Sequence, residues 1–185
     1  MNEAIFTQLQ KEMDGSVAAL RKELAKLRTG RASTALLENI MVEYYGATTP
    51  LNQLSTLSAP EPRLLVIQPF DRSAMAEIER AILKSDLGLT PNNDGKIIRI
   101  PIPQLTEERR KDLVKHVKKV AEEYRVSVRN HRRVAIEHLK EAEKKKEITA
   151  DDAKHGQDRV QKITDDFIGR IDKVVKAKEE EIMEV

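Results

Sequence analysis

All seven prolines of this 185-residue chain lie between positions 50 and 103. Proline lacks a backbone N–H and clashes with the preceding helical turn, so it interrupts long helices. The window from Arg31 to Leu105 should therefore fold as a separate unit of short elements. The proline-free segments on either side of it are able to form long helices.

Three segments outside this window repeat apolar residues at intervals of three and four, which is typical of amphipathic helices. The apolar positions are Ile5, Leu9, Met13, Val17, Leu20, Leu24 and Leu27 in the first segment; Leu113, Val117, Val120, Tyr124, Val128, Ala135, Leu139 and Ala142 in the second; and Val160, Ile163, Phe167, Ile171 and Val174 in the third. His131 interrupts the second series. Each apolar stripe is narrow, so the three helices should pack together as a bundle.

Helix-end signals accompany these repeats. Gly30 can take the left-handed conformation that ends a helix, so the first helix is expected to stop near Thr29–Gly30. Thr106 precedes acidic residues and predicts the start of the second helix, while Thr149 and Asp152 resemble a capping box for the third. A helix from Glu107 to Lys146 would be about 60 Å long, so the bundle should be elongated.

The proline-rich window shows a different pattern. Alternation at 40–44 and compact β-type runs at 63–67 and 97–102 predict three strands. Residues 51–57 suggest a further strand, and 73–85 suggests a helix started by Asp71 or Ser73. The fold class is therefore α+β. It combines an antiparallel three-helix bundle, residues 1–30 and 105–185, with an inserted β-rich α/β domain, residues 31–104.

Two stretches of chain connect these expected domains, which makes a hinge plausible. The residues expected to form it are Gly30, Arg31, Pro101, Pro103 and Gln104.

The usual catalytic and cofactor-binding patterns do not occur. The chain has no cysteine, and its four histidines lie on charge-rich helical segments without metal-ligand spacing. Glycine-rich phosphate loops are missing as well. We therefore expect no catalytic residues, no metal site and no cofactor. No apolar run is long enough to span a membrane and Met1–Ile5 does not resemble a secretory signal, so a soluble cytoplasmic protein is expected.

Positive charge gathers in one segment. Between Arg109 and Arg133 there are ten Lys or Arg residues against three Asp or Glu residues, a local net charge of +7, although the whole chain carries only +2. The residues Lys115, Lys118, Arg125, Arg129 and Arg132 share one helical face, with Glu122 as the acidic exception. Such a face suits a phosphate backbone. An ordinary solvated helix surface would show a similar pattern.

Several motifs are more specific than these patterns. They are Leu27–Ser33 (LRTGRAS), Val42–Gly46 (VEYYG), Pro69–Ser73 (PFDRS), Ser85–Leu89 (SDLGL), Arg99–Pro101 (RIP), Leu105–Leu113 (LTEERRKDL), Val128–Asn130 (VRN) and Arg132–Arg133. With these motifs, across nearly its whole length, the chain resembles the bacterial ribosome recycling factors.

The resemblance implies an L-shaped protein of tRNA-like outline with a flexible elbow. It also implies a translation factor without an active site of its own. Together with elongation factor G and GTP, such a factor separates post-termination ribosomes into subunits, releasing mRNA and tRNA for a new round of initiation. The bundle would bind rRNA of the large subunit, and the protein would act as a monomer. The rRNA-contacting residues would be Arg129, Arg132 and Arg133, with Arg110 and Arg28 as further candidates, all expected on the bundle.

Two other classes of protein would share some of these sequence features with a translation factor. A coiled-coil adaptor or chaperone would also have long charged helices and an inserted recognition module. A hydrolase with its site in the insert is harder to support, because the insert contains no His or Cys.

Overall fold

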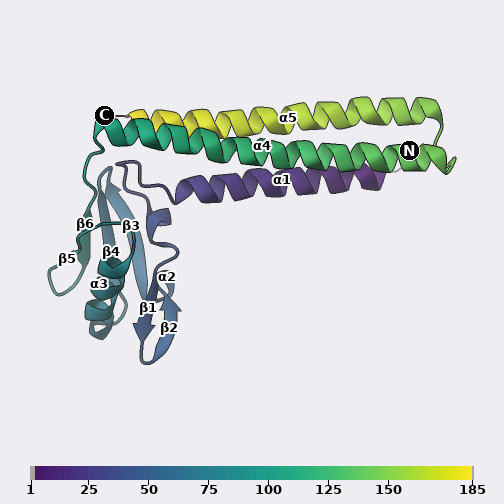
Figure 1. Cartoon of the computed structure of the whole chain (residues 1–185). Coiled ribbons are helices and arrows are strands. Elements are labelled where there is room, and N and C mark those ends of the chain that lie inside the picture. The colour runs from purple at the N-terminus through teal and green to yellow at the C-terminus, as the bar shows by residue number, and fades with distance from the viewer. Residues whose placement is uncertain (1–2, 185) are drawn as a thin grey trace. The chain divides into compact units, whose positions relative to one another are not determined.

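The computed structural model describes residues 3–184 and folds the three apolar repeats into three long helices (Figure 1). They are α1 (Glu3–Ala25), α4 (Glu107–Lys144) and α5 (Ala150–Met183). Each buries most of the apolar stripe predicted from the sequence, and Leu20, Val117 and Ile171 are fully buried. In α5 the predicted Val174 is only half-buried, and its neighbour Val175 is buried instead. The predicted bundle is thus confirmed, and the α+β class with it.

The chain divides into two compact units. One, here called the helical unit, comprises Met1–Leu24 and Lys111–Val185; the other, the inserted unit, comprises Ala25–Arg110. The domain limits expected from the sequence, 1–30 with 105–185 and 31–104, stay a prediction. Either way, the first helix joins the last two across an insertion.

Helix α1 ends earlier than predicted, at Ala25 and not near Thr29–Gly30. Gly30 does adopt a positive φ of 82°, but it lies beyond a non-helical stretch in which Thr29 is buried. Leu27 fits the helical period, and the period alone does not show where the chain turns away. The prediction of the helix end was therefore wrong by four residues.

The caps of the other helices are as predicted. The Thr106 hydroxyl accepts a hydrogen bond from the Arg109 N–H at 3.1 Å. At the start of α5, the Thr149 hydroxyl accepts from the Asp152 N–H and the Asp152 carboxylate accepts from the Thr149 N–H, both at 3.1 Å. These bonds satisfy backbone donors that have no partner within the helix.

The α4–α5 turn closes α4 with a Schellman motif. Lys146 has a φ of 60°, in the left-handed region. The Glu147 N–H donates to the Ala142 carbonyl and the Lys146 N–H donates to the Glu143 carbonyl, both at 2.9 Å. This geometry stops the helix without the glycine that usually occupies the position.

One polar cluster interrupts the apolar contact between α1 and α4. His131 places Nδ1 3.2 Å from the Glu12 carboxylate and Nε2 3.4 Å from the Ser16 hydroxyl. The Ser127 hydroxyl lies 3.3 Å from Ser16. The residue that breaks the apolar series in the sequence is therefore held by partners on α1 and is not simply exposed.

The inserted unit contains two antiparallel sheets. Strands β1 (Met41–Tyr44) and β2 (Ala47–Pro50) form a hairpin; β3 (Ser55–Glu61), β4 (Leu64–Pro69), β6 (Ile98–Pro101) and β5 (Asn92–Asn93) form a second sheet in the order β3-β4-β6-β5. The helices are α2 (Leu51–Leu54) and α3 (Met75–Lys84), with short 3₁₀ turns at Thr34–Leu37 and Arg72–Ala74. The strands expected at 40–44, 63–67 and 97–102 are confirmed, with small shifts of their ends.

The expected strand at 51–57 is only partly right. Its first half is the helical turn α2, and the strand β3 begins at Ser55. Leu51 and Leu54 are both buried, so a three-residue spacing here marks a helical turn packed on the core. Helix α3 follows an Asp71 cap as predicted, and Ile78 and Ile82 on it are fully buried.

Candidate nucleic-acid interface

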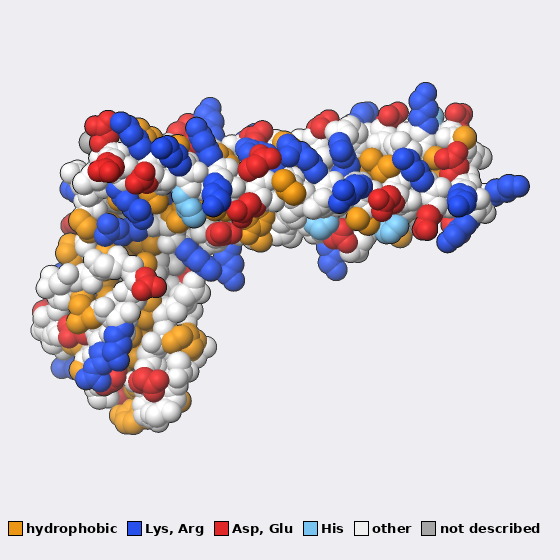
Figure 2. Space-filling model, viewed as in Figure 1, with side chains coloured by type: hydrophobic (Ala, Val, Ile, Leu, Met, Phe, Trp, Pro, Cys, Tyr) orange, Lys and Arg blue, Asp and Glu red, His pale blue; other side chains and the backbone are white. Residues whose placement is uncertain are grey.

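The basic segment of the sequence lies on α4, whose buried face is set by Val117, Val128 and Ala135. The opposite face is exposed to solvent, and Lys and Arg side chains lie along the bundle helices with Asp and Glu side chains between them (Figure 2). The positive face is therefore not uniform. Whether this face of α4 can bind phosphates depends on which of its Lys and Arg side chains already pair with acidic side chains of the protein.

Arg125 is committed to contacts within the protein. Its guanidinium donates to the Asp172 carboxylate of α5 at 2.7 Å and to Glu122 at 3.3 Å. Only 21% of its side chain is exposed. Arg125 was expected on the phosphate-binding face, but in this structure it ties α4 to α5.

Arg129 is more accessible. Half of its side chain is exposed, and it forms an ion pair with Glu122 at 3.0 Å. Hydrogen bonds from Arg129 and then Arg125 hold the pKa of the Glu122 carboxyl below its usual value. An exposed pair of this kind contributes little to stability and exchanges partners readily.

Arg132 and Arg133 bond to neutral groups. Arg132 donates to the Gln161 side-chain oxygen of α5, and Arg133 donates to the Asn130 side-chain oxygen, both at 3.0 Å. The Nε of Arg132 is buried and lacks a hydrogen-bond partner within residues 3–184. Both guanidinium groups thus keep a positive charge that none of these hydrogen bonds neutralises, held in a defined orientation.

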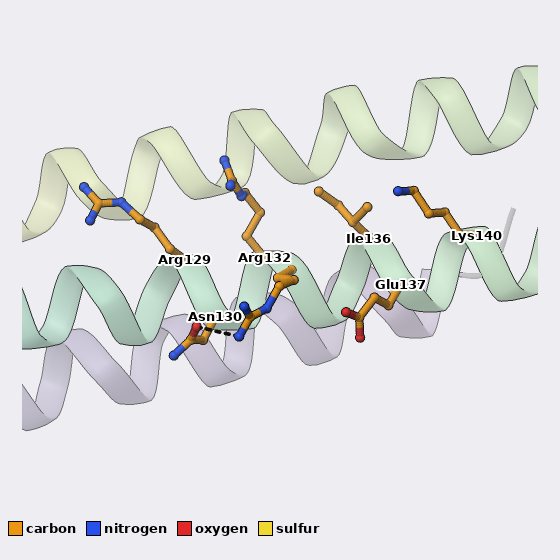
Figure 3. Close-up of a pocket in the computed structure, with 7 residues that line it drawn as sticks. Arg129, Asn130, Arg132, Ile136, Glu137 and Lys140 are labelled. Atoms are coloured by element: carbon orange, nitrogen blue, oxygen red, sulfur yellow. Dashed lines mark hydrogen bonds between the residues drawn. The ribbon is translucent and has the colours of Figure 1, made fainter.

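These arginines line one hollow of about 290 Å³ on the bundle surface. Its walls are Arg129, Asn130, Arg132, Arg133, Ile136, Glu137 and Lys140. Arg129, Arg132, Ile136 and Lys140 extend from α4 toward α5, whereas Asn130 and Glu137 lie on the other side of α4 (Figure 3). Four cations and one acid around a shallow hollow suit an anionic ligand such as a phosphate chain.

The comparison with protein-family models finds the model described as "Ribosome recycling factor" matching residues 20–183. The chain belongs to the ribosome recycling factor family.

Relatives in the family share the full length. The chain is 58% identical over 185 residues to the ribosome-recycling factor of Halalkalibacterium halodurans, covering 100% of both chains. It is 57% identical over 180 residues to that of Natranaerobius thermophilus, covering 97% of this chain and 98% of the relative.

Two solved structures of the family share the fold. One is a solution structure of the ribosome recycling factor, with a TM-score of 0.78, 46% identity and full coverage of both chains. The other has a TM-score of 0.69, 48% identity and 98% coverage of each chain. It is described as models for the T. thermophilus ribosome recycling factor and the E. coli elongation factor G bound to the E. coli post-termination complex. The resemblance inferred from the motifs is confirmed.

The other candidate residues from the family motifs lie elsewhere. Arg110 is half-buried in the first turn of α4, with a buried Nε that has no partner among the described residues. Arg28 is half-buried in the segment after α1. In the division into two compact units both fall at the ends of the inserted unit, and neither lines the hollow.

The five expected hinge residues also lie in the inserted unit. Pro101 is the last residue of β6 and pairs with Leu64, so it is part of the sheet. Gly30 carries the positive φ noted above, and a Cβ there would lie 3.5 Å from the Leu105 side chain.

Two exposed valines of α4, Val126 and Val134, were not singled out from the sequence. Both are nearly half exposed, and each lies within one turn of an arginine along α4. The sequence could have pointed to these two valines, because neither fits the three-and-four spacing of the buried apolar residues of α4.

Other kinds of site find no support in the described part of the chain. Residues 3–184 contain no group of three or more His, Cys, Asp or Glu side chains placed to hold a metal ion. Of the helices formed by these residues, none has the length and hydrophobicity to cross a bilayer.

Proposed function

We propose that this chain is a translation factor that separates the post-termination ribosome into subunits, together with elongation factor G and GTP, and so releases mRNA and tRNA for a new round of initiation. The observation that carries the proposal is identity of 55–58% over the full length to ribosome-recycling factors. A relative with 48% identity is described on the post-termination complex with elongation factor G.

In this proposal the bundle binds rRNA of the large subunit. Arg132 and Arg133 are bonded to neutral partners and so keep their positive charge, and Arg129 can exchange Glu122 for a phosphate. Contacts of this kind position a protein on RNA by shape and charge without reading sequence. Arg110 and Arg28 would add contacts outside the hollow.

The partner hydrolyses the nucleotide, so the proposal assigns this chain no catalytic residue and no cofactor. The protein acts as a monomer in the cytoplasm, where bacterial ribosomes work. Movement around Gly30, Arg31, Pro101, Pro103 and Gln104 would let the inserted unit respond to elongation factor G.

Polysome breakdown tests the function directly. Post-termination polysomes are mixed with this protein, elongation factor G and GTP, and the products are separated on sucrose gradients. We expect release of subunits with all three components and far less with either factor alone. An adaptor or chaperone would leave the gradient profile unchanged, and that result would reject the proposal.

A binding assay tests the rRNA surface. Arg132→Ala and Arg133→Gln should weaken pelleting with large subunits and reduce its dependence on log salt, by about 1 in slope for each lost phosphate contact. Arg21→Ala removes the same charge from an exposed position of α1 and serves as the control. Equal loss in all three variants would show that only net charge matters.

The hinge needs a different substitution from the obvious one. Gly30→Pro cannot test stiffness, because proline cannot adopt the φ of 82° found at this position. Gln104→Pro is a better test of stiffness, because Gln104 is an exposed residue in a loop. It should slow polysome breakdown while leaving large-subunit binding intact; unchanged breakdown would remove the need for a flexible hinge at this point.

A further inference from the structure

Helix α4 carries two large apolar side chains on its solvent side. Val126 is 47% exposed and Val134 is 43% exposed. Valine is a weaker helix former than the Lys, Glu or Arg residues common on such a face, and exposing it to water has a cost. Neither valine belongs to the buried stripe by which α4 packs in the bundle.

The valines alternate with the charged groups of the same face. Val126 lies one turn before Arg129 and Asn130, and Val134 follows Arg133 directly and lies one turn after Asn130. Arg133 is held by Asn130 at 3.0 Å. The spacing along α4 therefore places Val126 within one turn of Arg129 and Val134 within one turn of Arg133.

Such a surface matches a particular part of RNA. The minor groove of A-form RNA is wide and shallow, and it exposes sugars between the two lines of phosphates. Guanidinium groups bond to phosphate oxygens, and methyl groups pack on the apolar carbon atoms of the sugars. A surface meant for phosphates alone would have polar residues at both valine positions.

We propose that Val126 and Val134 pack against riboses in the minor groove of an rRNA helix whose phosphates are bound by Arg129 and Arg133. This inference rests on the proposed function and adds the groove and the type of contact. Charge decides for RNA over a protein partner, because the segment that contains Val126 has a net charge of +7 from Arg109 to Arg133.

The test compares apolar with charge substitutions in large-subunit binding at several salt concentrations. Val126→Thr and Val134→Thr keep the shape of each side chain and replace one methyl by a hydroxyl at an exposed site. Together they should weaken binding roughly tenfold, from the transfer free energy of about one methyl group each, with an unchanged salt slope. Arg129→Gln with Arg133→Gln should instead lower the slope by about 2.

Met183→Gln, at another exposed apolar position of the bundle, is the matched control and should bind normally. If the threonine variant binds like the parent while the arginine variant loses slope, the packing proposal is wrong and the rRNA surface stands. If the parent protein shows no salt-dependent binding, the proposed function fails first and the packing proposal with it.

Hydroxyl-radical footprinting of the bound parent protein gives a second measurement that needs no variant to fold. The radicals attack sugars, so we expect a short run of protected riboses on facing strands of one minor groove. Weaker binding of the threonine variant without any ribose protection would place the valines against a ribosomal protein and overturn the proposal.

Discussion

Gly156 of α5 lies against Leu139 of α4 so closely that a Cβ on the glycine would be 3.0 Å from both methyl carbons of the leucine. Leu139 is only 1% exposed, so it has little room to withdraw. Alanine gains about 1 kcal/mol in helix propensity, but overpacking costs about 1–3 kcal/mol. We expect Gly156→Ala to lower the free energy of unfolding by about 1 kcal/mol in urea denaturation.

Gly15→Ala is the matched control. Gly15 is exposed on α1, and a Cβ there would meet nothing within 4 Å. This substitution should raise the free energy of unfolding by about 0.5–1 kcal/mol. Equal stabilisation by both alanines would mean that the α4–α5 contact is looser than the structure shows.

The capping box should make the start of α5 sensitive to acid. Hydrogen bonds from the Thr149 N–H and hydroxyl lower the pKa of Asp152 from its ordinary 3.8. A carboxylate with a lowered folded pKa stabilises the protein fully above the unfolded pKa and loses this effect as the pH falls through the folded pKa. The stability difference between the parent and Asp152→Ala should therefore be constant near neutral pH and shrink below about pH 4. A difference that grows on acidification would contradict the capping box.

A tyrosine to aspartate contact should be visible in the inserted unit by NMR. The Tyr44 hydroxyl donates to Asp71 at 2.8 Å, and the pKa of Asp71 is lowered by hydrogen bonds from Ser73 and then Tyr44. Tyr44→Phe should raise the pKa of Asp71 in a carboxyl ¹³C titration. Tyr45→Phe, whose hydroxyl lies near Ser73 and not Asp71, should change it less.

Removing an internal competitor should strengthen RNA binding. Glu122 accepts hydrogen bonds from Arg129 at 3.0 Å and Arg125 at 3.3 Å. Glu122→Gln frees Arg129 for phosphate, so we expect tighter binding to large subunits at low salt. Glu180→Gln makes the same charge change at an exposed site on α5. If both variants bind equally well, the Glu122 to Arg129 pair does not compete with RNA.

The long helices could be predicted because each has a buried apolar stripe of period 3.6. For α4 and α5 the sequence also contains a residue whose side chain can cap the start of the helix. The end of α1 could not be predicted, since Leu27 continues the period after the helix has stopped. Residues 51–57 were misjudged for a related reason: four residues are too few for periodicity to separate a helical turn from a strand.

The arginine-rich site could be predicted only as a set of charges. Spacing placed Arg125 and Arg129 on one face, but it could not show that Asp172, 47 residues away along the chain, takes Arg125 out of that face. Nor could it show that Gln161 and Asn130 hold Arg132 and Arg133 without neutralising them. Which cations are available is decided by partners distant in sequence.

The meeting of Ser16, Ser127, His131 and Glu12 also restricts how the bundle assembles. Aliphatic stripes on α1 and α4 would pack almost equally well if one helix slid by a heptad along the other. Such a shift would carry Ser16 about 10 Å from His131 and break the contacts of Ser16 with Ser127 and His131 and of Glu12 with His131. Contacts among these four polar side chains therefore favour one alignment of α1 against α4 over others that apolar stripes alone would allow.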